Sequence, residues 1–548
     1  MIKILINLKR LIRTLMLSRV PIWGLVISLS LLTFAILLFT TLYTSQDSEL
    51  FTVLDSHILG LLKFTLYQAF LSTVLSLLVG VLLAWALAHQ SRFRGRSLLV
   101  ALFSSSLVLP TLIVVFGLIG IFGRNGYLNQ LSLFLFDHSF GSYIYGLVGI
   151  LLAHVYLNAS FASRALLHSF ESIPKEKYKL AKSLNFSVFE RFWYVEYPAL
   201  KSTLLSIGAT IFLLCFTSFA VVLLLGGSPS YNTLEVAIYE AVKLDFDIGM
   251  ALKLALIQLS ISAVLVLLSS GFKTDVANLK TSHTLIPWRE PKILRVLQWC
   301  IIGVFTLFFL LPLLVIVLDG VGTDFGRLLQ EPLFIKSFIT SLSLATVSSI
   351  VTVIIALLIS HARVSLTLST RLANKPFVRV LDGMVAFSGN LYLAIPSLVL
   401  GLGFFLMYQN AEGSEIVWAS VALLTANVLM SLPFALSVLT PAMHKTAQRY
   451  DKLAFSLGLS GWRRWTMVEY PYLKASLGYV FALAFCFSLG DLGIIALFGS
   501  EDFMTLPWYL YQLMGSYRTT DAAGVALVML MLVLAVFMVI PRVLRGKM

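Results

Sequence analysis

The sequence predicts an all-α integral membrane protein, with about twelve transmembrane helices in two parallel repeats of six. Three observations support this fold class. Hydrophobic residues make up 59% of the 548 residues and charged residues only 12%, whereas a soluble domain needs roughly 25% charged residues to cover its surface. Long apolar stretches can each cross roughly 30 Å of hydrocarbon. Matches between the two halves share a single offset of 273 residues.

The repeat is clearest in the tetrapeptide Val-Glu-Tyr-Pro, which occurs at residues 195–198 and again at 468–471. Neighbouring residues match at the same spacing, so the repetition is not a coincidence. The further pairs are Leu180 and Leu453, Ala181 and Ala454, Ser187 and Ser460, Arg191 and Arg464, Leu200 and Leu473, Lys201 and Lys474, and Lys63 and Lys336. The chain is therefore two copies of one unit.

Apolar stretches place six spans in each half. In the first half they lie near residues 21–43, 60–89, 98–121, 144–166, 203–226 and 249–271. In the second half they lie near residues 298–319, 337–361, 380–408, 416–440, 476–498 and 522–541. The first stretch is too long for the core of a signal peptide, so we expect an uncleaved first span.

The distribution of charge orients the spans. Of the 40 Lys and Arg residues, 33 fall in alternate loops, and 16 of the 26 acidic residues fall in the other loops and span ends. Basic loops stay in the cytoplasm, so both termini are expected there. The net charge of +14 does not indicate nucleic-acid binding, because no soluble segment gathers the basic residues on one face.

The repeat and the spans divide the chain into six regions. They are a basic segment with the first span (1–58), a first transmembrane domain (59–271), a cytoplasmic linker (272–297), a seventh span with an outer loop (298–332), a second transmembrane domain (333–541) and a basic tail (542–548). Since the linker joins the halves on the inside, both have the same topology. A solute path between them is expected.

Proline interrupts the third span of each half, at Pro110 and Pro396. A proline kinks a helix, and in lipid the freed carbonyl group must find another partner. Two interpretations are open, a packing kink or a bent helix that lines a path of variable width.

Two long cytoplasmic loops, roughly 167–202 and 441–475, follow the fourth span of each half. Each is expected to contain two short helices, broken near Asn185 or Gly458. A serine is placed to cap the second helix, and Tyr-Pro is expected to end it. A hairpin on the lipid headgroups is the alternative, but two equal protrusions favour a soluble partner with two lobes.

The spacing in these loops resembles the EAA motif of ABC importer permeases, which reads Glu-Ala-Ala, three residues, Gly, nine residues, Ile, one residue, Leu-Pro. Lys179 and Lys452 replace the leading glutamate, and Asn185 replaces the glycine, although asparagine also tolerates a left-handed bend. The resemblance implies a type I ABC importer fold with loops that dock on an ABC ATPase dimer. The residues assigned to coupling are Leu180, Ala181, Asn185, Arg191, Val195, Tyr197, Pro198, Leu453, Ala454, Gly458, Arg464, Val468, Tyr470 and Pro471.

The similarity extends beyond the loops. Residues 149–155, 489–498 and 506–518 are similar to the permeases of thiamine importers, which are fused proteins of about this length. This resemblance implies a bacterial inner membrane, thiamine or its phosphates as the solute, and a periplasmic thiamine-binding protein. No phosphate-binding Gly-x-x-x-x-Gly-Lys-Ser/Thr loop is present, so we expect ATP-Mg in a partner chain. This chain is expected to have no cofactor, no metal site and no enzymatic activity.

An acidic residue, Asp491, lies inside the eleventh span. An ionisable group at membrane depth is costly, so it faces a cavity or a partner. The thiazolium charge of thiamine would suit this carboxylate and nearby aromatic rings. The alternative is that Asp491 hydrogen-bonds neighbouring helix ends. The candidate path residues are Asp491, Gly490, Gly493, Phe485, Phe487, Pro110 and Pro396.

Two minor features complete the prediction. Cys215, Cys300 and Cys486 lie in apolar runs and are expected to be small buried residues without disulfides. The aromatic residues at 508–511 are expected to anchor a loop at the membrane interface.

Three other functions were weighed. A fused permease for ferric iron would share the loops and the length. An ion-coupled secondary transporter would use Asp491 as its ion site, but it leaves the paired loops unexplained. A membrane-embedded enzyme ranks last, because no cluster of histidines, acids or nucleophile–base pairs is found in the sequence.

Overall fold

The computed structural model describes residues 20–44, 55–104, 106, 108–227, 230–269, 288, 290–368, 376–408 and 414–545. Within these residues every regular element is a helix. They form two compact units, each assembled from separate parts of the chain. Unit 1 comprises Met1–Ser48, Pro332–Trp508 and Met531–Met548, and unit 2 comprises Glu49–Glu331 and Tyr509–Leu530. Most of the expected linker and the basic N-terminal segment lie outside the described residues.

Unit 2 contains most helices of the first half and the seventh span. They are α3 (Ser56–His89), α4 (Arg96–Ser104), α5 (Thr111–Phe122), α6 (Tyr127–Phe136), α7 (Leu147–Glu171), α8 (Lys175–Ser183), α9 (Val188–Arg191), η2 (Phe192–Glu196), α10 (Tyr197–Phe216), α11 (Phe219–Leu225), α12 (Leu234–Lys243), α13 (Ile248–Ser269), α14 (Lys292–Val321) and α15 (Phe325–Leu328).

Unit 1 contains the first span and most helices of the second half. They are α2 (Val20–Thr44), α16 (Pro332–Leu368), α17 (Pro376–Asn390), η3 (Leu391–Leu393), α18 (Ser397–Tyr408), α19 (Glu415–Ser456), α20 (Gly461–Arg464), η4 (Trp465–Glu469), α21 (Tyr470–Gly490) and α22 (Gly493–Phe498). Two helices begin in one unit and end in the other, α23 (Leu506–Gly515) and α24 (Thr519–Arg545).

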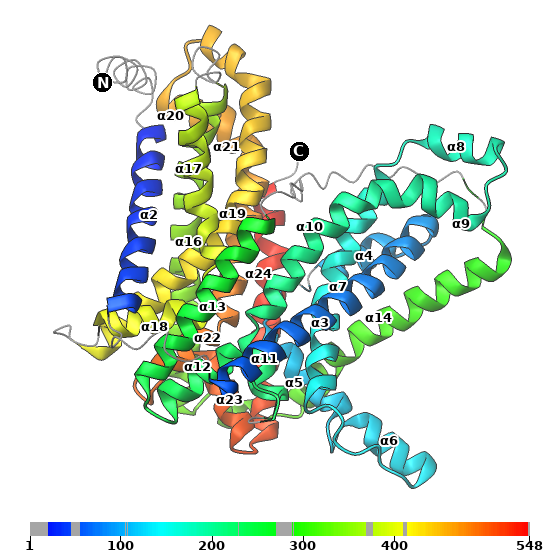
Figure 1. Cartoon of the computed structure of the whole chain (residues 1–548), viewed down its shortest axis with the longest axis vertical. Helices are drawn as coiled ribbons and strands as arrows, with labels where there is room; N and C mark the ends of the chain where they lie inside the picture. The colour runs from blue at the N-terminus through cyan, green and yellow to red at the C-terminus, as the bar shows by residue number, and fades with distance from the viewer. Residues whose placement is uncertain are drawn as a thin grey trace. The chain divides into compact units, whose positions relative to one another are not determined.

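The first span of the chain packs within unit 1 and the seventh within unit 2. Helix α2 packs against α16, α17 and α18, and α14 packs against α3 and α5 (Figure 1). A buried tyrosine hydroxyl fastens each one: Tyr392 donates to the Leu31 carbonyl at 2.7 Å, and Tyr156 donates to the Phe309 carbonyl at 2.8 Å. The first span therefore packs with helices of the second half of the chain, and the seventh span packs with helices of the first half.

The expectation of about twelve spans is confirmed. Among the described residues, eleven helices are long and apolar enough to cross a membrane, and a bent pair raises the number to twelve. The pair joins Pro376–Leu393 to Ser397–Tyr408 at 94°. Together with the repeat, these helices establish an all-α, multi-pass membrane protein.

Proline breaks the third span of each half completely. Pro110 precedes α5, and Pro396 lies immediately before α18. Each proline carbonyl accepts the first helical hydrogen bond of the new helix, from Val114 at 3.2 Å and from Leu400 at 3.0 Å. The predicted interruption is thus confirmed, although as a break rather than a kink. Proline has no backbone N–H to bond to the preceding turn, and it is well suited to the start of a helix.

The fifth span of each half is also broken, which the sequence analysis did not predict. The breaks lie at Thr217 and Ser218 in the first half and at Asp491 and Leu492 in the second. Helices α12 and α23 follow, and they are largely buried. The expectation of an interfacial aromatic loop at 508–511 is therefore wrong for Trp508 and Tyr509, whose side chains are buried in α23.

Polar side chains also join the long helices within each unit, and His154 and Asn427, which match at the 273-residue offset, each bind a serine of a different span. In unit 2 the Ser72 hydroxyl lies 2.9 Å from Nδ1 of His154, and in unit 1 the Asn427 amide donates to the Ser488 hydroxyl at 2.9 Å. Such bonds hold membrane helices together, because lipid provides no alternative partner. The cysteine prediction is correct for Cys215 and Cys486, which are buried, and wrong for Cys300, which is exposed on α14.

Candidate coupling site

The two long loops bend in the same way. Asn185 has a φ of 53° and Gly458 a φ of 64°, the left-handed conformation that ends helices and that glycine and asparagine tolerate best. Beyond each bend the next backbone N–H donates to an earlier carbonyl, Phe186 to Ala181 at 3.0 Å and Leu459 to Ala454 at 2.9 Å. The substitution of asparagine for glycine in the first copy therefore leaves the bend unchanged.

The serine cap forms in one copy only. Ser187 accepts a hydrogen bond from the backbone of Glu190 at 3.3 Å, and the Glu190 carboxylate accepts one from the backbone of Ser187 at 2.7 Å. This is a complete capping box. Ser460 makes no side-chain cap bond, and Arg463 stands at the position of Glu190, so the second copy cannot form a capping box. The capping prediction is thus confirmed for the first loop and wrong for the second.

The Tyr-Pro pairs do not end a helix. Each opens a long transmembrane helix, α10 or α21, with the proline in its first turn. A five-residue π-helical segment, η2 or η4, precedes it and connects it to the short helix of the loop. Proline is tolerated there because the first turn needs no hydrogen-bond donor. The loop helix and the fifth span are therefore mechanically continuous.

The second loop differs from the expectation in one further way. Helix α19 runs from Glu415 to Ser456 through Pro433 and Pro441. The first short helix of that loop is thus fused to the fourth span, whereas α8 is separate from α7. The coupling segment of the second half is an extension of a transmembrane helix.

A buried ion cluster anchors the first loop to unit 2. The Glu196 Oε1 atom lies 3.0 Å from Nε2 of His89 and 3.1 Å from Nε of Arg191. The Glu290 Oε1 atom lies 2.9 Å from Nδ1 of His89 and 2.7 Å from Nη2 of Arg191. All four side chains are at most 3% exposed. In addition, the Arg191 guanidinium lies 4.9 Å from the ring centre of Trp288.

Burial and charge oppose each other at Glu290. Burial alone would raise the pKa of this carboxyl group. Hydrogen bonds and positive charge from His89 and Arg191 outweigh that effect and lower its pKa below the ordinary value. The carboxylate is therefore held in its charged form.

The second loop has a similar ion cluster, in which a histidine and an arginine again bind the glutamate of the repeated tetrapeptide. The Glu469 Oε2 atom lies 3.2 Å from Nε2 of His361, and its Oε1 atom lies 2.8 Å from Nε of Arg464. Nη2 of Arg464 also pairs with Oδ1 of Asp451 at 2.9 Å. This cluster is more open, with the Arg464 and Asp451 side chains 36% and 39% exposed.

Both long loops expose apolar side chains to solvent. They repeat at the 273-residue offset, and each is between 56% and 75% exposed. The set is Leu180, Leu184 and Phe189 in the first copy and Leu453, Leu457 and Trp462 in the second. We call these two sets the paired loop faces. Apolar groups gathered on a polar loop are typical of a protein interface.

The predicted coupling residues fall into three groups. Leu180, Leu453, Tyr470 and Pro198 are exposed, and Asn185 and Gly458 form the bends. Tyr197, Pro471, Val468 and Arg464 are partly exposed. Ala181, Ala454, Val195 and Arg191 are buried. Arg191 thus acts inside the loop base and cannot reach a docked partner.

The predicted path residues come together only in part. The carboxylate of Asp491 accepts a hydrogen bond from the Gly493 backbone at 3.2 Å, as the helix-end alternative predicted. Its other oxygen, Oδ2, is buried without a hydrogen-bond partner in the described part of the chain. A Cβ at Gly493 would lie 2.4 Å from the Ser397 hydroxyl, so glycine lets α18 approach the break closely. Gly490 is the residue before the break, at the end of α21.

The aromatic and proline candidates do not gather around Asp491. Phe485 is buried and stacks on Phe481 at 6.3 Å, and Phe487 packs edge-on against Phe434 at 4.9 Å. The partner of Phe485 lies on the same helix, α21, and the partner of Phe487 lies on α19. Pro110 belongs to unit 2 and Pro396 to unit 1.

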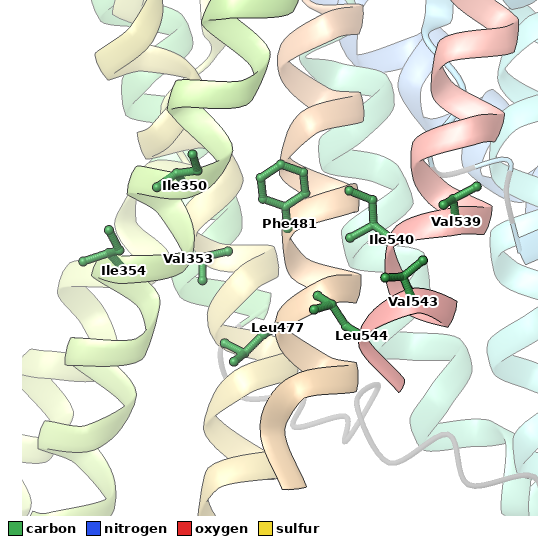
Figure 2. A pocket seen from close by; sticks show the side chains of 9 residues that line it. All are labelled: Ile350, Val353, Ile354, Leu477, Phe481, Val539, Ile540, Val543 and Leu544. Atoms are coloured by element: carbon green, nitrogen blue, oxygen red, sulfur yellow. The ribbon is translucent and has the colours of Figure 1, made fainter. Parts of the chain in front are cut away.

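A groove in unit 1 does not suit a cationic solute. It has a volume of about 510 Å³ and lies between α16, α21 and α24 (Figure 2). Its lining is wholly apolar and consists of Ile350, Val353, Ile354, Leu477, Phe481, Val539, Ile540, Val543 and Leu544. No side chain there can pair with a charge, so the groove is not a site for a cation.

The sequence analysis missed the ion clusters. Glu196 and Glu469 stood in the repeated tetrapeptide without a role. No role was assigned to His89 or His361, although they repeat at an offset of 272 residues. That repetition is the signal that could have found both clusters. Glu290 has no counterpart in the repeat and carried no signal.

Comparison with known proteins agrees with this architecture. The family described as "Binding-protein-dependent transport system inner membrane component" matches residues 76–273 and 364–544. The Escherichia coli protein named "Thiamine transport system permease protein ThiP" is 39% identical over 503 residues, which cover 91% of each chain. The proteins of the same name from Salmonella typhimurium and Haemophilus influenzae are 38% and 37% identical, covering 95% and 87% of this chain and 97% and 87% of theirs. This chain therefore belongs to the family of binding-protein-dependent transport system inner membrane components, the permease subunits of ABC importers.

Proposed function

We propose that this permease imports thiamine, and also thiamine phosphates, through a complex with a separate ABC ATPase dimer and a periplasmic thiamine-binding protein. The solute is inferred from the names of relatives that match nearly the full length of the chain. The ATPase would hold ATP-Mg, and this chain would contribute no cofactor and no covalent chemistry. Both termini would lie in the cytoplasm of a bacterium, as the charge distribution favours.

The paired loop faces carry the proposal of a two-lobed ATPase partner. Three apolar side chains in each loop are exposed at equivalent positions. An ATPase dimer offers two equivalent surfaces, so it would bury both faces by the same contacts. Each face would also be linked directly to a transmembrane helix. The reason is that α9, η2 and α10 form one nearly continuous helix, as do α20, η4 and α21.

The proposed mechanism is a change of permease conformation driven by ATP. Coupling requires that ATP-bound ATPase favours one conformation through contacts that the other conformation lacks. The continuous helices α9–η2–α10 and α20–η4–α21 would transmit the motion along the fifth spans, which are broken at Ser218 and at Asp491. We propose that Asp491, with its one unpartnered carboxylate oxygen, lines the path.

Uptake of labelled thiamine into proteoliposomes tests this function. The vesicles would contain this chain, its ATPase and its binding protein, with or without internal ATP. We expect uptake only when all three proteins and ATP are present. Uptake by this chain alone under an ion gradient would instead establish a secondary transporter. ATP hydrolysis and assembly without movement of thiamine would keep the ABC complex and direct the search to ferric iron and other small solutes.

A further inference from the structure

The two ion clusters share three contacts, and they differ in the source of one carboxylate, which in the first cluster also pairs with the second ring nitrogen of the histidine. In each, the histidine Nε2 and the arginine Nε bind the glutamate of Val-Glu-Tyr-Pro, and the arginine Nη2 binds a second acid. In the second half that acid is Asp451, near the end of α19. In the first half it is Glu290, which belongs to the segment between the two halves. The ion pair of the arginine Nη2 atom is therefore made with acids from different parts of the two halves.

The repeat explains why the first loop needs an outside acid. The residue that matches Asp451 at the 273-residue offset is Tyr178. Tyr178 is buried beside the first cluster, where burial and the neighbouring Glu196 carboxylate raise the pKa of its hydroxyl. A neutral tyrosine cannot balance the charge of Arg191. Glu290 supplies the carboxylate that the first repeat lacks at this position.

Burial makes this carboxylate more necessary in the first cluster than in the second. Arg191 is fully buried, and an arginine does not lose its proton to escape burial. Arg464 remains 36% exposed, so water can solvate part of its charge. Without Glu290, only Glu196 would face the positive charges of Arg191 and of a protonated His89.

The segment around Glu290 is built into unit 2 on three sides. The Trp288 ring lies against the Arg191 guanidinium, at 4.9 Å. Helix α14 begins at Lys292, directly after Glu290 and Pro291. Nearly two turns further along α14, the Gln298 side chain accepts a hydrogen bond of 2.7 Å from Gln90, the residue after His89. Glu290 thus joins the base of α14, the end of α3 and the first loop.

We propose that Trp288 and Glu290 are positioning residues of the first coupling loop, in which Glu290 replaces from the linker the carboxylate that Asp451 provides in the second half. They hold the α9–η2 segment at a fixed position on α3 and α14, so that motion of the ATPase is transmitted and not lost as local movement. The first loop is consequently held more rigidly than the second. This inference rests on the proposed function, because it assigns the loops to coupling.

Hydrogen exchange of the purified full-length chain gives a test that does not depend on the solute. In Glu290→Gln, backbone amides of residues 188–197 should exchange about tenfold faster or more, while those of residues 461–470 keep their wild-type rate. Asp451→Asn is the matched control and should act on 461–470 alone, with a smaller effect. Each variant thus carries its own internal reference in the other loop.

Two rescue variants separate positioning from general destabilisation. Glu290→Asp keeps the charge and should restore most of the protection of residues 188–197. Tyr178→Asp, added to Glu290→Gln, transplants the arrangement of the second half and should restore it as well. If Glu290→Gln accelerates exchange equally in both loops, or in neither, the positioning role is overturned.

The functional readout is the number of thiamine molecules transported per ATP hydrolysed by the complete complex in proteoliposomes. We expect Glu290→Gln to lower this ratio several-fold while ATP hydrolysis continues, and Glu290→Asp to recover it. An unchanged ratio in Glu290→Gln would overturn the proposal. If the wild-type complex moves no thiamine, the proposed solute is wrong, and the exchange experiment still decides the role of Glu290.

Discussion

His89 and His361 bind the same glutamate of their own repeats, through the same ring nitrogen, at 3.0 Å from Glu196 and 3.2 Å from Glu469. Each histidine lies on the long second helix of its half, and each glutamate closes the π-helical segment of a loop. The loop bases are therefore fixed to the transmembrane helices by equivalent polar contacts. Several consequences of this arrangement can be measured.

Removing the charge of the repeated glutamate should lower the free energy of unfolding more in the first half, at Glu196, than in the second, at Glu469. Glu196→Gln leaves two buried cationic groups with one acid fewer, and breaking a buried pair costs about 3–5 kcal/mol. Glu469→Gln should cost about 1–2 kcal/mol less than that, because its arginine is partly solvated. Thermal unfolding of both variants in detergent measures the order. An equal loss in the two variants would contradict the difference in burial.

The left-handed bends predict opposite responses to substitution. Gly458→Ala should destabilise the protein by about 1 kcal/mol, because a Cβ is strained at a φ of 64° even though space around it is open. Asn185→Gly should be neutral or slightly stabilising. Gly303→Ala, at an open position inside α14, is the control and should not destabilise. Unfolding temperatures of the three variants provide the measurement.

Charge placed on the paired loop faces should prevent docking of the ATPase. Leu184→Glu and Leu457→Glu change side chains that are more than half exposed, so the permease should fold normally. Each should weaken association at least about tenfold, the effect of desolvating an unpaired charge in an interface. Co-purification with the ATPase measures it.

Tyr517→Glu is the control for this experiment. It introduces the same charge at an exposed aromatic residue between α23 and α24, outside both loops. Association should remain at the wild-type level. If Leu184→Glu and Leu457→Glu also bind normally, the ATPase docks elsewhere.

The break in the eleventh span predicts a selective loss of transport. Asp491→Asn keeps an oxygen that can accept from the Gly493 backbone but removes the charge. Uptake should fall about tenfold, the effect of one charged contact to the solute, while assembly with the ATPase stays intact. Ser218→Ala changes the equivalent position of the first half and should have little effect. Unchanged uptake in Asp491→Asn would remove this residue from the path.

Acid should abolish the contribution of Glu290 to stability. Its pKa is lowered in the folded protein, so the stabilisation is fully present above its unfolded pKa of about 4.5 and is lost as the pH falls through the lower folded value. The groups that face it are His89, Arg191, Glu196 and Tyr178. The unfolding temperatures of wild type and Glu290→Gln should therefore differ at pH 6, and the difference should shrink as the pH falls below about 4.5. A constant difference would show that Glu290 acts by packing alone.

Local patterns predicted the parts of the site that depend on near neighbours in the chain. The bends at Asn185 and Gly458 and the capping box of Ser187 follow from the conformational preferences of a few adjacent residues. The Tyr-Pro prediction failed for a tertiary reason. The loop helix continues into the fifth span through a π-helical segment that the local sequence does not reveal, and the proline falls in the first turn of that span, where no donor is needed.

The sequence by itself determined that this chain crosses the membrane about twelve times, repeats at an offset of 273 residues and carries two equivalent loops. Hydropathy, charge and repetition are properties of the chain that need no contact to be visible. Only the tertiary structure decided which residues secure those loops. His89 and Glu196 are 107 residues apart, and Glu290 comes from outside the repeat. Their pairing arises because a buried arginine requires carboxylates nearby, wherever in the chain these are found.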